Sequence, residues 1–423
     1  MIKEDFLHYI WQSKKFELTE LRSTNGQLIQ ILDFGYLNTD SGPDFFNAKI
    51  GLDGFVWAGN LEIHVLSSDW IKHKHQFDPA YRNVILHVVL EEDVIIKDID
   101  GNTIPCLELK KRINKNELSK YTLLQNQQSW IPCERIIHSV SDLSKIQAIE
   151  KAAISRLEAK SLYIQRLLTF TNFHWEYSFL IMLFRYFGSN VNSDAFESLA
   201  KSIAPSLLQK EKSNPLYLEA LLFGQAGMLN GNSQDEYYLN LQKRYWFQLS
   251  KYSLTPVPGS SFKLMRMRPS AFPTIRISQL SSLIYNTASF FDIIREKIAL
   301  TDLRKIFDAT AGPYWDDHYL FDKKSKAQIK KTSERFKENL MINVVVPFLH
   351  YYGKAKDNEE YTRRAIDLLE ALPFENNRIM REWKNYDMPV KSALDSQGLL
   401  ELKKEFCSNK KCLTCPVGHE IMR

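Results

Sequence analysis

Two apolar runs separated by Asp53-Gly54 are the feature that most limits what this chain can fold into. The runs cover residues 46–52 and 55–65, and an Asp-Gly pair between two such runs is typical of the tight turn of a β-hairpin. Further apolar runs predict strands over residues 28–32, 83–90 and 103–109. Apolar residues at helical spacing predict one helix before the hairpin, over residues 5–16. The sequence therefore predicts a small mixed sheet with a helix at its start.

From Ser141 onward the pattern is almost entirely helical, with apolar residues at spacings of three and four. A change of this kind marks a domain boundary, which we expect between Arg112 and Ser141. The fold class is therefore α+β. We expect a small α/β domain over residues 1–125, an all-α domain over residues 140–400, and a cysteine-rich tail over residues 401–423.

The composition is that of an ordinary globular protein, with 44% hydrophobic and 25% charged residues. The most apolar window, residues 179–187, is interrupted by Arg185 and is much shorter than the ~20 residues that a membrane-spanning helix requires. No secretory leader follows Met1. We expect a cytoplasmic protein with no membrane partner.

Charge is distributed unevenly along the chain. Residues 1–130 hold 14 basic and 18 acidic side chains, whereas the remainder holds 41 and 32. An acidic region suits cations, and a basic region suits polyanions. This distribution makes nucleic acid, DNA or RNA, the expected partner of the helical part, although solvated helix faces carry a basic excess equally well.

Asp44, Glu62 and His64 form the first candidate site. Strand alternation directs Glu62 and His64 to the same face, and Asp44 begins the neighbouring strand. Two carboxylates that converge beside a basic group can hold Mg²⁺ or Mn²⁺, which activates water and stabilises charge on a phosphoryl oxygen. The sequence predicts metal binding by Asp44 and Glu62 and a catalytic role for all three residues; the alternative is a Glu-His pair that only orders the hairpin.

The order of a helix, a strand, a strand with Pro43-Asp44, a strand with Glu62-x-His64 and a further strand resembles the PD-(D/E)XK nuclease core. The resemblance covers about residues 1–110 and implies metal-dependent hydrolysis of phosphodiester bonds. The chain departs from that pattern in two ways. His64 stands where the superfamily usually has lysine, and the helix expected before the last strand is reduced to residues 78–81.

A second candidate site follows at His73, His75 and Asp78. These residues resemble the His-x-His plus Asp patterns of metallo-β-lactamase-like and amidohydrolase sites, with a spacing one residue longer than the first of these. The resemblance implies a zinc-dependent hydrolase. Histidines that line a groove or bond to the backbone are the alternative, and His87 is expected to be a buried core histidine.

The tail contains Cys407, Cys412, Cys415 and His419. A Cys-x₂-Cys pair can present two thiolates to one ion, and the other two residues complete a Cys₃His zinc site. The tail also resembles the cysteine-rich ends of endonuclease III-like glycosylases and of iron–sulfur nucleases in which one distant cysteine joins three near the carboxy terminus. That resemblance implies an iron–sulfur cluster, with Cys133 as the distant ligand.

Two basic segments in the helical part are candidates for substrate binding. Lys263, Arg266 and Arg268 lie among apolar and aromatic residues, a composition suited to phosphates and bases, and residues 323–337 carry seven basic side chains. The alternative for the first segment is an irregular stretch that packs its apolar residues against the core. The alternative for residues 323–337 is a solvated helix face.

Several short motifs together resemble an uncharacterised bacterial family of unknown function, and the resemblance covers the whole chain. The motifs are Asn38, Gly42-Pro43-Asp44-Phe45, Trp57-x-Gly59-Asn60-x-Glu62-Ile63-His64, Ser68-Asp69-Trp70, Arg266-x-Arg268-Pro269 and Phe272-Pro273, with the closing cysteines. The functional hypothesis is a metal-dependent nuclease. The alternatives are a non-catalytic nucleic-acid or protein-binding module that keeps a decayed nuclease fold, and a zinc hydrolase that uses His73, His75 and Asp78.

Overall fold

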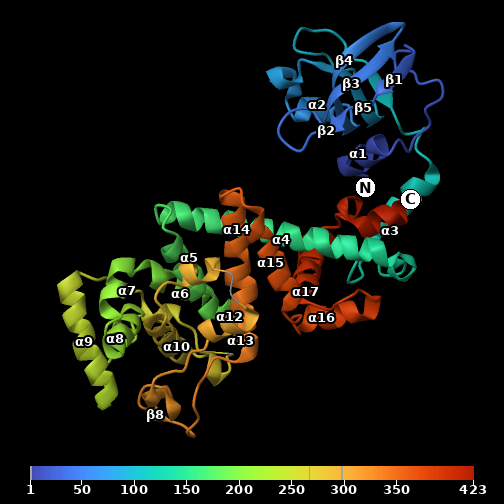
Figure 1. Cartoon of the computed structure of the whole chain (residues 1–423). Coiled ribbons are helices and arrows are strands. Elements are labelled where there is room, and N and C mark those ends of the chain that lie inside the picture. Colours follow the sequence, from blue (N-terminus) through green and yellow to red (C-terminus); the bar gives the residue numbers. More distant parts are fainter. Residues whose placement is uncertain (1, 266, 297–298) are drawn as a thin grey trace. The chain divides into compact units, whose positions relative to one another are not determined.

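The computed structural model describes residues 2–265, 267–296 and 299–423, and the chain folds into two units (Figure 1). The first unit contains residues 1–148, 382–388 and 402–423, and the second contains residues 149–381 and 389–401. The confirmed fold class is α+β, with a mixed sheet at the amino terminus followed by a larger helical region. The tail therefore folds with the amino-terminal unit.

The sheet of the first unit has six strands, in the order β1-β3-β4-β5-β6, with β2 also paired to β3. The strands are β1 Ile29–Asp33, β2 Tyr36–Leu37, β3 Phe45–Leu52, β4 Phe55–Leu66, β5 Val84–Glu91 and β6 Cys106–Glu108. β1, β3 and β4 pair antiparallel, whereas β4, β5 and β6 pair parallel. The long strand β4 thus stands between the antiparallel and the parallel parts.

The predicted hairpin is β3 and β4. Leu52 pairs with Phe55, and Asp53 and Gly54 both take positive φ, at 47° and 88°. Two successive positive φ values are what a two-residue hairpin turn with right-handed strand twist requires, and Asp-Gly adopts them at little steric cost. The first half of β4 is largely exposed, and its second half, from Leu61 onward, enters the core.

Helix α1 Glu4–Gln12 packs against β4 and buries Phe6, Leu7 and Ile10. The chain between β4 and β5 contains the short helix α2 Asp69–Lys72 and two 3-10 turns, in agreement with the reduced helix expected there. Helix α3 Lys115–Asn126 and the final helix α18 Pro416–Met422 contact each other and complete the first unit.

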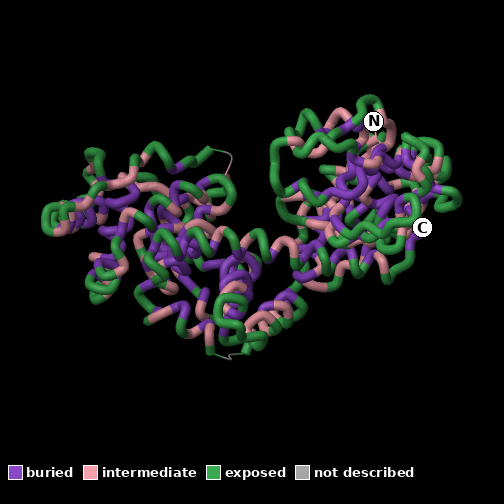
Figure 2. The backbone as a smooth tube through the Cα atoms, turned by 90° about the horizontal axis from the view of Figure 1, so that it is seen from above, coloured by how far each residue is buried: buried purple, intermediate pink, exposed green. Residues whose placement is uncertain are grey.

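In its described residues the second unit contains fourteen α-helices, counting α4, which crosses the boundary between the units. They are α4 Asp142–Phe170, α5 Trp175–Phe187, α6 Ser189–Lys201, α7 Pro205–Glu211, α8 Pro215–Gln225, α9 Glu236–Tyr252, α10 Pro273–Asn286, α11 Phe290–Arg295, α12 Leu300–Ile306, α13 Glu334–Leu340, α14 Val346–Ala355, α15 Glu359–Ala371, α16 Arg378–Trp383 (which ends in the first unit) and α17 Ala393–Glu401, with the small hairpin β7 His318–Leu320 and β8 Lys323–Lys324. Their apolar faces enclose one continuous core, and each unit has its own buried interior (Figure 2).

The apolar spacing predicts one continuous helix over residues 277–296 and another over residues 327–350, and the structure differs from both predictions. The segment 277–296 is interrupted at residues 287–289, where Ser289 caps α11 by accepting a hydrogen bond from the amide of Asp292 at 3.4 Å. The segment 327–350 becomes helical only after Ser333, which caps α13 through the amide of Phe336. In both places a serine hydroxyl satisfies a free helix amide, so a new helix begins where apolar periodicity alone predicted a continuous one.

None of the helices in the described ranges combines the length and apolar character that a membrane crossing requires.

Candidate metal centre

Asp44 and Glu62 meet across the β3–β4 pair, as the sequence predicted. The amide of Asp44 donates to Oε2 of Glu62 at 3.1 Å, and the amide of Ile63 donates to Oδ2 of Asp44 at 2.9 Å. Asn38 shapes the loop before Asp44, because its side-chain amide donates to the carbonyl oxygens of Ser41 and Pro43 at 3.2 and 3.0 Å. The two carboxylates are therefore held by the backbone of the opposite strand.

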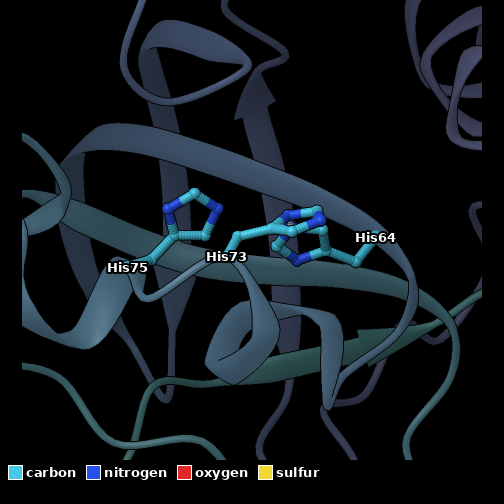
Figure 3. A group of neighbouring side chains, drawn as sticks. All are labelled: His64, His73 and His75. Carbon is cyan, nitrogen blue, oxygen red and sulfur yellow. Dashed lines mark hydrogen bonds between the residues drawn. The ribbon is translucent and has the colours of Figure 1, made fainter.

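Three histidines converge beside Glu62: His64 from β4, and His73 and His75 from the segment after α2 (Figure 3). One ring nitrogen from each lies within 4.8 Å of the other two. Nε2 of His64 is 3.1 Å from Nδ1 of His73 and 3.4 Å from Oε1 of Glu62, which is in turn 3.2 Å from Nε2 of His75. The two sites inferred separately from the sequence are one site in the structure.

His73 and His75 reach this point through a helix end rather than an extended segment. His73 is the C-cap of α2, and Lys74 takes a left-handed conformation at φ 65° before the 3-10 turn that begins at His75. Trp70, which is 1% exposed, packs its ring edge-on to His75, and Tyr81 stacks on the other side at 3.8 Å between ring centroids. Trp70 and Tyr81 thus fix the ring plane of His75.

Burial controls the charge states in the centre. Burial, and after it the negative charge of Asp44, raises the pKa of Glu62 to about 9. Burial and the neighbouring His87 lower the pKa of His64 to about 2, and burial also lowers the pKa of His75. A neutral imidazole keeps a lone pair for a metal, and a buried carboxylate needs a cation beside it.

His87 lies behind the three histidines and orients one of them. Nδ1 of His64 is 2.9 Å from Nε2 of His87, which is fully buried and paired in register with Glu62 across β4 and β5. A histidine whose second nitrogen is held in this way has a fixed ring orientation, as metal-ligating histidines do. His87 is therefore buried as predicted, but it contacts the centre instead of only filling the core.

Sequence reasoning missed Glu4 and His8, which α1 brings to the rim of the centre. Nε2 of His8 is 3.1 Å from Oδ2 of Asp44. Burial by itself would lower the pKa of His8, but the hydrogen bond and charge of Asp44, followed by the charge of Glu4, raise it above its ordinary value. The signal was only partly present, because the predicted helix, residues 5–16, contains His8 but begins one residue after Glu4, whereas the observed helix begins at Glu4 and places the two residues one turn apart.

The residues present fit a single metal ion. Ligands that each lie about 2.1 Å from one ion are about 3.0–3.4 Å apart, which matches the separations among Glu62, His64, His73 and His75. Nε2 of His75, although 3.2 Å from Oε1 of Glu62, does not meet the geometry of a hydrogen bond to it, and a metal between the two atoms would satisfy both. The rim at His73 and Asp44 is open to solvent.

Asp78 lies outside this set. Its Oδ1 accepts the amide of Ala80 at 2.9 Å and so caps the 3-10 turn Pro79–Tyr81. A ligand role for Asp78 stays a prediction, and its observed role is that of a cap.

The predicted phosphate-binding residues belong to the second unit. Lys263 and Arg268 are exposed, and the backbone of Lys263 is fixed by two hydrogen bonds with the side chain of Asn192; Arg266 lies outside the described residues. Within the basic segment 323–337, Lys330 is buried and donates to the carbonyl oxygen of Asp316, and Lys337 pairs with Asp308. The positive charges of Lys330 and Lys337 therefore both have partners within the protein.

The tail cysteines gather around one cavity. Cys407, Cys412 and Cys415 line it together with Cys133, whereas His419 is exposed and its ring meets that of Tyr9 edge-on, outside the lining residues.

Comparison with protein families shows to which family this chain belongs. A family model described as protein of unknown function (DUF2851) matches residues 4–378. The chain belongs to this family. The predicted whole-chain resemblance is thus confirmed, whereas the PD-(D/E)XK resemblance stays a prediction. Neither a curated protein nor a solved structure matches the chain.

Proposed function

We propose that this protein is a metal-dependent hydrolase that cleaves phosphodiester bonds in nucleic acid. The observation that carries the proposal is the convergence of one carboxylate and three imidazoles, from Glu62, His64, His73 and His75, at separations suited to one ion. Imidazole nitrogens favour zinc and iron, and carboxylates favour magnesium and manganese. The mixed set favours Mn²⁺ or Zn²⁺ over the Mg²⁺ of the first hypothesis.

A bound ion in such a centre supplies an activated water and positive charge beside a phosphoryl oxygen. Glu62 and the imidazoles would hold it, and Asp44 would act by fixing Glu62 through its amide. His8 is the accessible group next to Asp44, with its side chain 24% exposed. Its Nε2 atom, which is buried against Oδ2 of Asp44, is suited to pass a proton to or from that carboxylate.

Two features support nucleic acid as the substrate. The first is the order of α1, β1, β3, β4 and β5, with an acidic residue opening β3 and Glu62-x-His64 in β4, which resembles the PD-(D/E)XK core. The second is the basic excess of the later part of the chain, including the exposed Lys263 and Arg268. Action on nucleic acid also fits the cytoplasmic location that we expect.

The test is cleavage of labelled single- and double-stranded DNA and RNA with Mn²⁺, Zn²⁺ or Mg²⁺, together with metal analysis. We expect Glu62→Gln and His75→Ala each to lower cleavage by more than about 100-fold and to lower metal content. Asp78→Asn is the matched control, since asparagine keeps the cap and should leave both values unchanged. Cleavage that persists in both ligand variants would refute the proposal, and loss in Asp78→Asn would favour a zinc hydrolase that uses Asp78.

A second candidate, a nucleic-acid-binding module without catalysis, is favoured by one observation. Both carboxylates already accept backbone amides, Glu62 from Asp44 and Asp44 from Ile63, and these bonds tie β3 to β4. A purely structural centre predicts tight binding of nucleic acid, no turnover with any of the three metals, and a large loss of stability in Glu62→Ala, which removes the acceptor of the Asp44 amide.

A further inference from the structure

Four cysteines line a single cavity of the first unit: Cys133, Cys407, Cys412 and Cys415. Cys133, Cys412 and Cys415 are buried, and Cys407 is half-buried. None of the chain's five cysteines, all of which are described, forms a disulfide. Thiols rarely gather in this way by chance, because chance apolar packing has no preference for cysteine over other small side chains.

The tail is folded so that its three cysteines face one point. The π-helical segment Leu402–Cys407 ends at Cys407, the 3-10 turn Cys412–Thr414 follows, and α18 begins directly after Cys415. Gly418 allows this packing, because a Cβ atom there would lie 2.0 Å from the carbonyl oxygen of Cys412. Only glycine permits so close an approach of the helix to the Cys-x₂-Cys loop.

Cys133 is brought to the same point from a distant part of the sequence. Lys403 donates to the carbonyl oxygen of Trp130 at 2.7 Å, and Gln125 donates to that of Lys410 at 3.1 Å. The ring of Trp130 stacks on Tyr386, from residues 382–388, the second segment of the unit. Polar and aromatic contacts therefore hold Cys133 beside the tail although nearly the whole second unit separates them in sequence.

The four sulfur atoms do not include three that lie within 4.8 Å of one another, as ligands of one zinc ion would. A tetrahedral zinc with Zn–S bonds of about 2.3 Å holds its sulfur ligands about 3.8 Å apart. Among the described residues, ligand atoms that lie in threes within 4.8 Å of one another are found at His64, His73 and His75, and not among the cysteines. In an iron–sulfur cluster each thiolate can bind a different iron ion, so the ligand sulfurs stand further apart.

We propose that Cys133, Cys407, Cys412 and Cys415 hold an iron–sulfur cluster that fastens the tail to the amino-terminal unit. Each thiol gives up its proton and forms one S–Fe bond; ferrous or ferric iron and inorganic sulfide are the other components. The apolar walls, which include Leu124, Phe406 and Val417, exclude water from such a cluster. This site is separate from the histidine centre and does not depend on the proposed function.

A cluster at this position closes a very long loop of the chain. Cross-links of this kind stabilise mainly by limiting the freedom of the unfolded chain, and the effect grows with loop length. The cluster would therefore act as a structural clip, and its loss would release the tail before the rest of the first unit unfolds.

The test starts with the full chain produced and purified without oxygen. We expect two or four iron ions, with matching inorganic sulfide, per chain, and the visible absorption of sulfur-to-iron charge transfer. Absence of iron and inorganic sulfide, both in the purified chain and after reconstitution with ferrous iron and sulfide, would overturn the proposal. The metal and sulfide content of the unaltered protein decides this even if a variant fails to fold.

Three variants assign the ligands. Cys133→Ser should lose the iron and the visible absorption, whereas Cys106→Ser, at a buried cysteine of β6 outside the cavity, should keep both. His419→Ala should also keep both. Retention of metal in Cys133→Ser together with its loss in His419→Ala would overturn the four-cysteine assignment in favour of the Cys₃His zinc site.

Discussion

Replacing Glu62 by glutamine should change how the stability of the metal-free protein depends on pH. The pKa of Glu62 is about 9 in the folded chain, because of burial and then the charge of Asp44, against an ordinary value of 4.5. Between these values the folded chain binds one more proton than the unfolded chain. The free energy of unfolding therefore falls as pH rises, by about 1.4 kcal/mol per pH unit, and is greatest below the ordinary value.

From about pH 6 to about pH 8 this decline amounts to about 3 kcal/mol. Glutamine has the shape of the protonated acid, can still accept the amide of Asp44, and does not titrate, so Glu62→Gln should lack this part of the slope. Because other groups titrate in the same range, the measured quantity is the difference between the two slopes.

The assay is urea unfolding of the chelator-treated proteins over this pH range, followed by circular dichroism and by hydrogen exchange of the β4 amides. Saturating Mn²⁺ or Zn²⁺ should flatten the slope of the unaltered protein, since the ion replaces the proton on Glu62. Parallel curves for the two metal-free proteins would refute the reasoning about burial of this carboxylate.

Three other changes test the surroundings of the two sites. His87→Leu should lower metal affinity at the histidine centre by about 10–100-fold, measured by calorimetric titration, because His64 loses the partner that orients its ring; unchanged affinity would make His87 a packing residue only. Gly418→Ala should lower the free energy of unfolding by about 1–3 kcal/mol, because its new methyl group meets the backbone of Cys412. Gly231→Ala is the matched control. The nearest contact of its new methyl group is at 3.4 Å, so this substitution should change the free energy of unfolding little. Asn38→Ala should loosen the loop before Asp44 and lower cleavage more than it lowers thermal stability, with equal losses as the contradicting result.

Local patterns were sufficient for the elements that carry the centre. Alternation and the Asp53-Gly54 pair predicted the hairpin, its register placed Asp44 opposite the Glu62 segment, and helical spacing predicted α1. The same reasoning did not assign Glu4 or His8 to the centre, because a helix pattern says which face is apolar but not which strand that face will cover.

The segment that contains His73 and His75 shows most clearly what local sequence patterns cannot predict. If this segment were an extended strand, His73 and His75 would lie on the same side of it, and the spacing of residues would not identify Glu62 as their neighbour. The fold instead ends a helix at His73 and turns the chain at Lys74, and the edge-on ring of Trp70 and the stacked ring of Tyr81 direct His75 to Glu62. No spacing rule gives that result, because it depends on packing between segments that are far apart in sequence.

The amino-acid sequence by itself determined the α+β class, the hairpin, the pairing of Asp44 with Glu62 and the clustering of cysteines in the tail, since each depends on residues close together in the chain. Only the tertiary structure decided that two predicted sites are one centre and that Cys133 joins the tail while His419 points elsewhere. The physical reason is that ligand sets form by long-range packing, whose free energy depends on the whole core and cannot be read from local spacing.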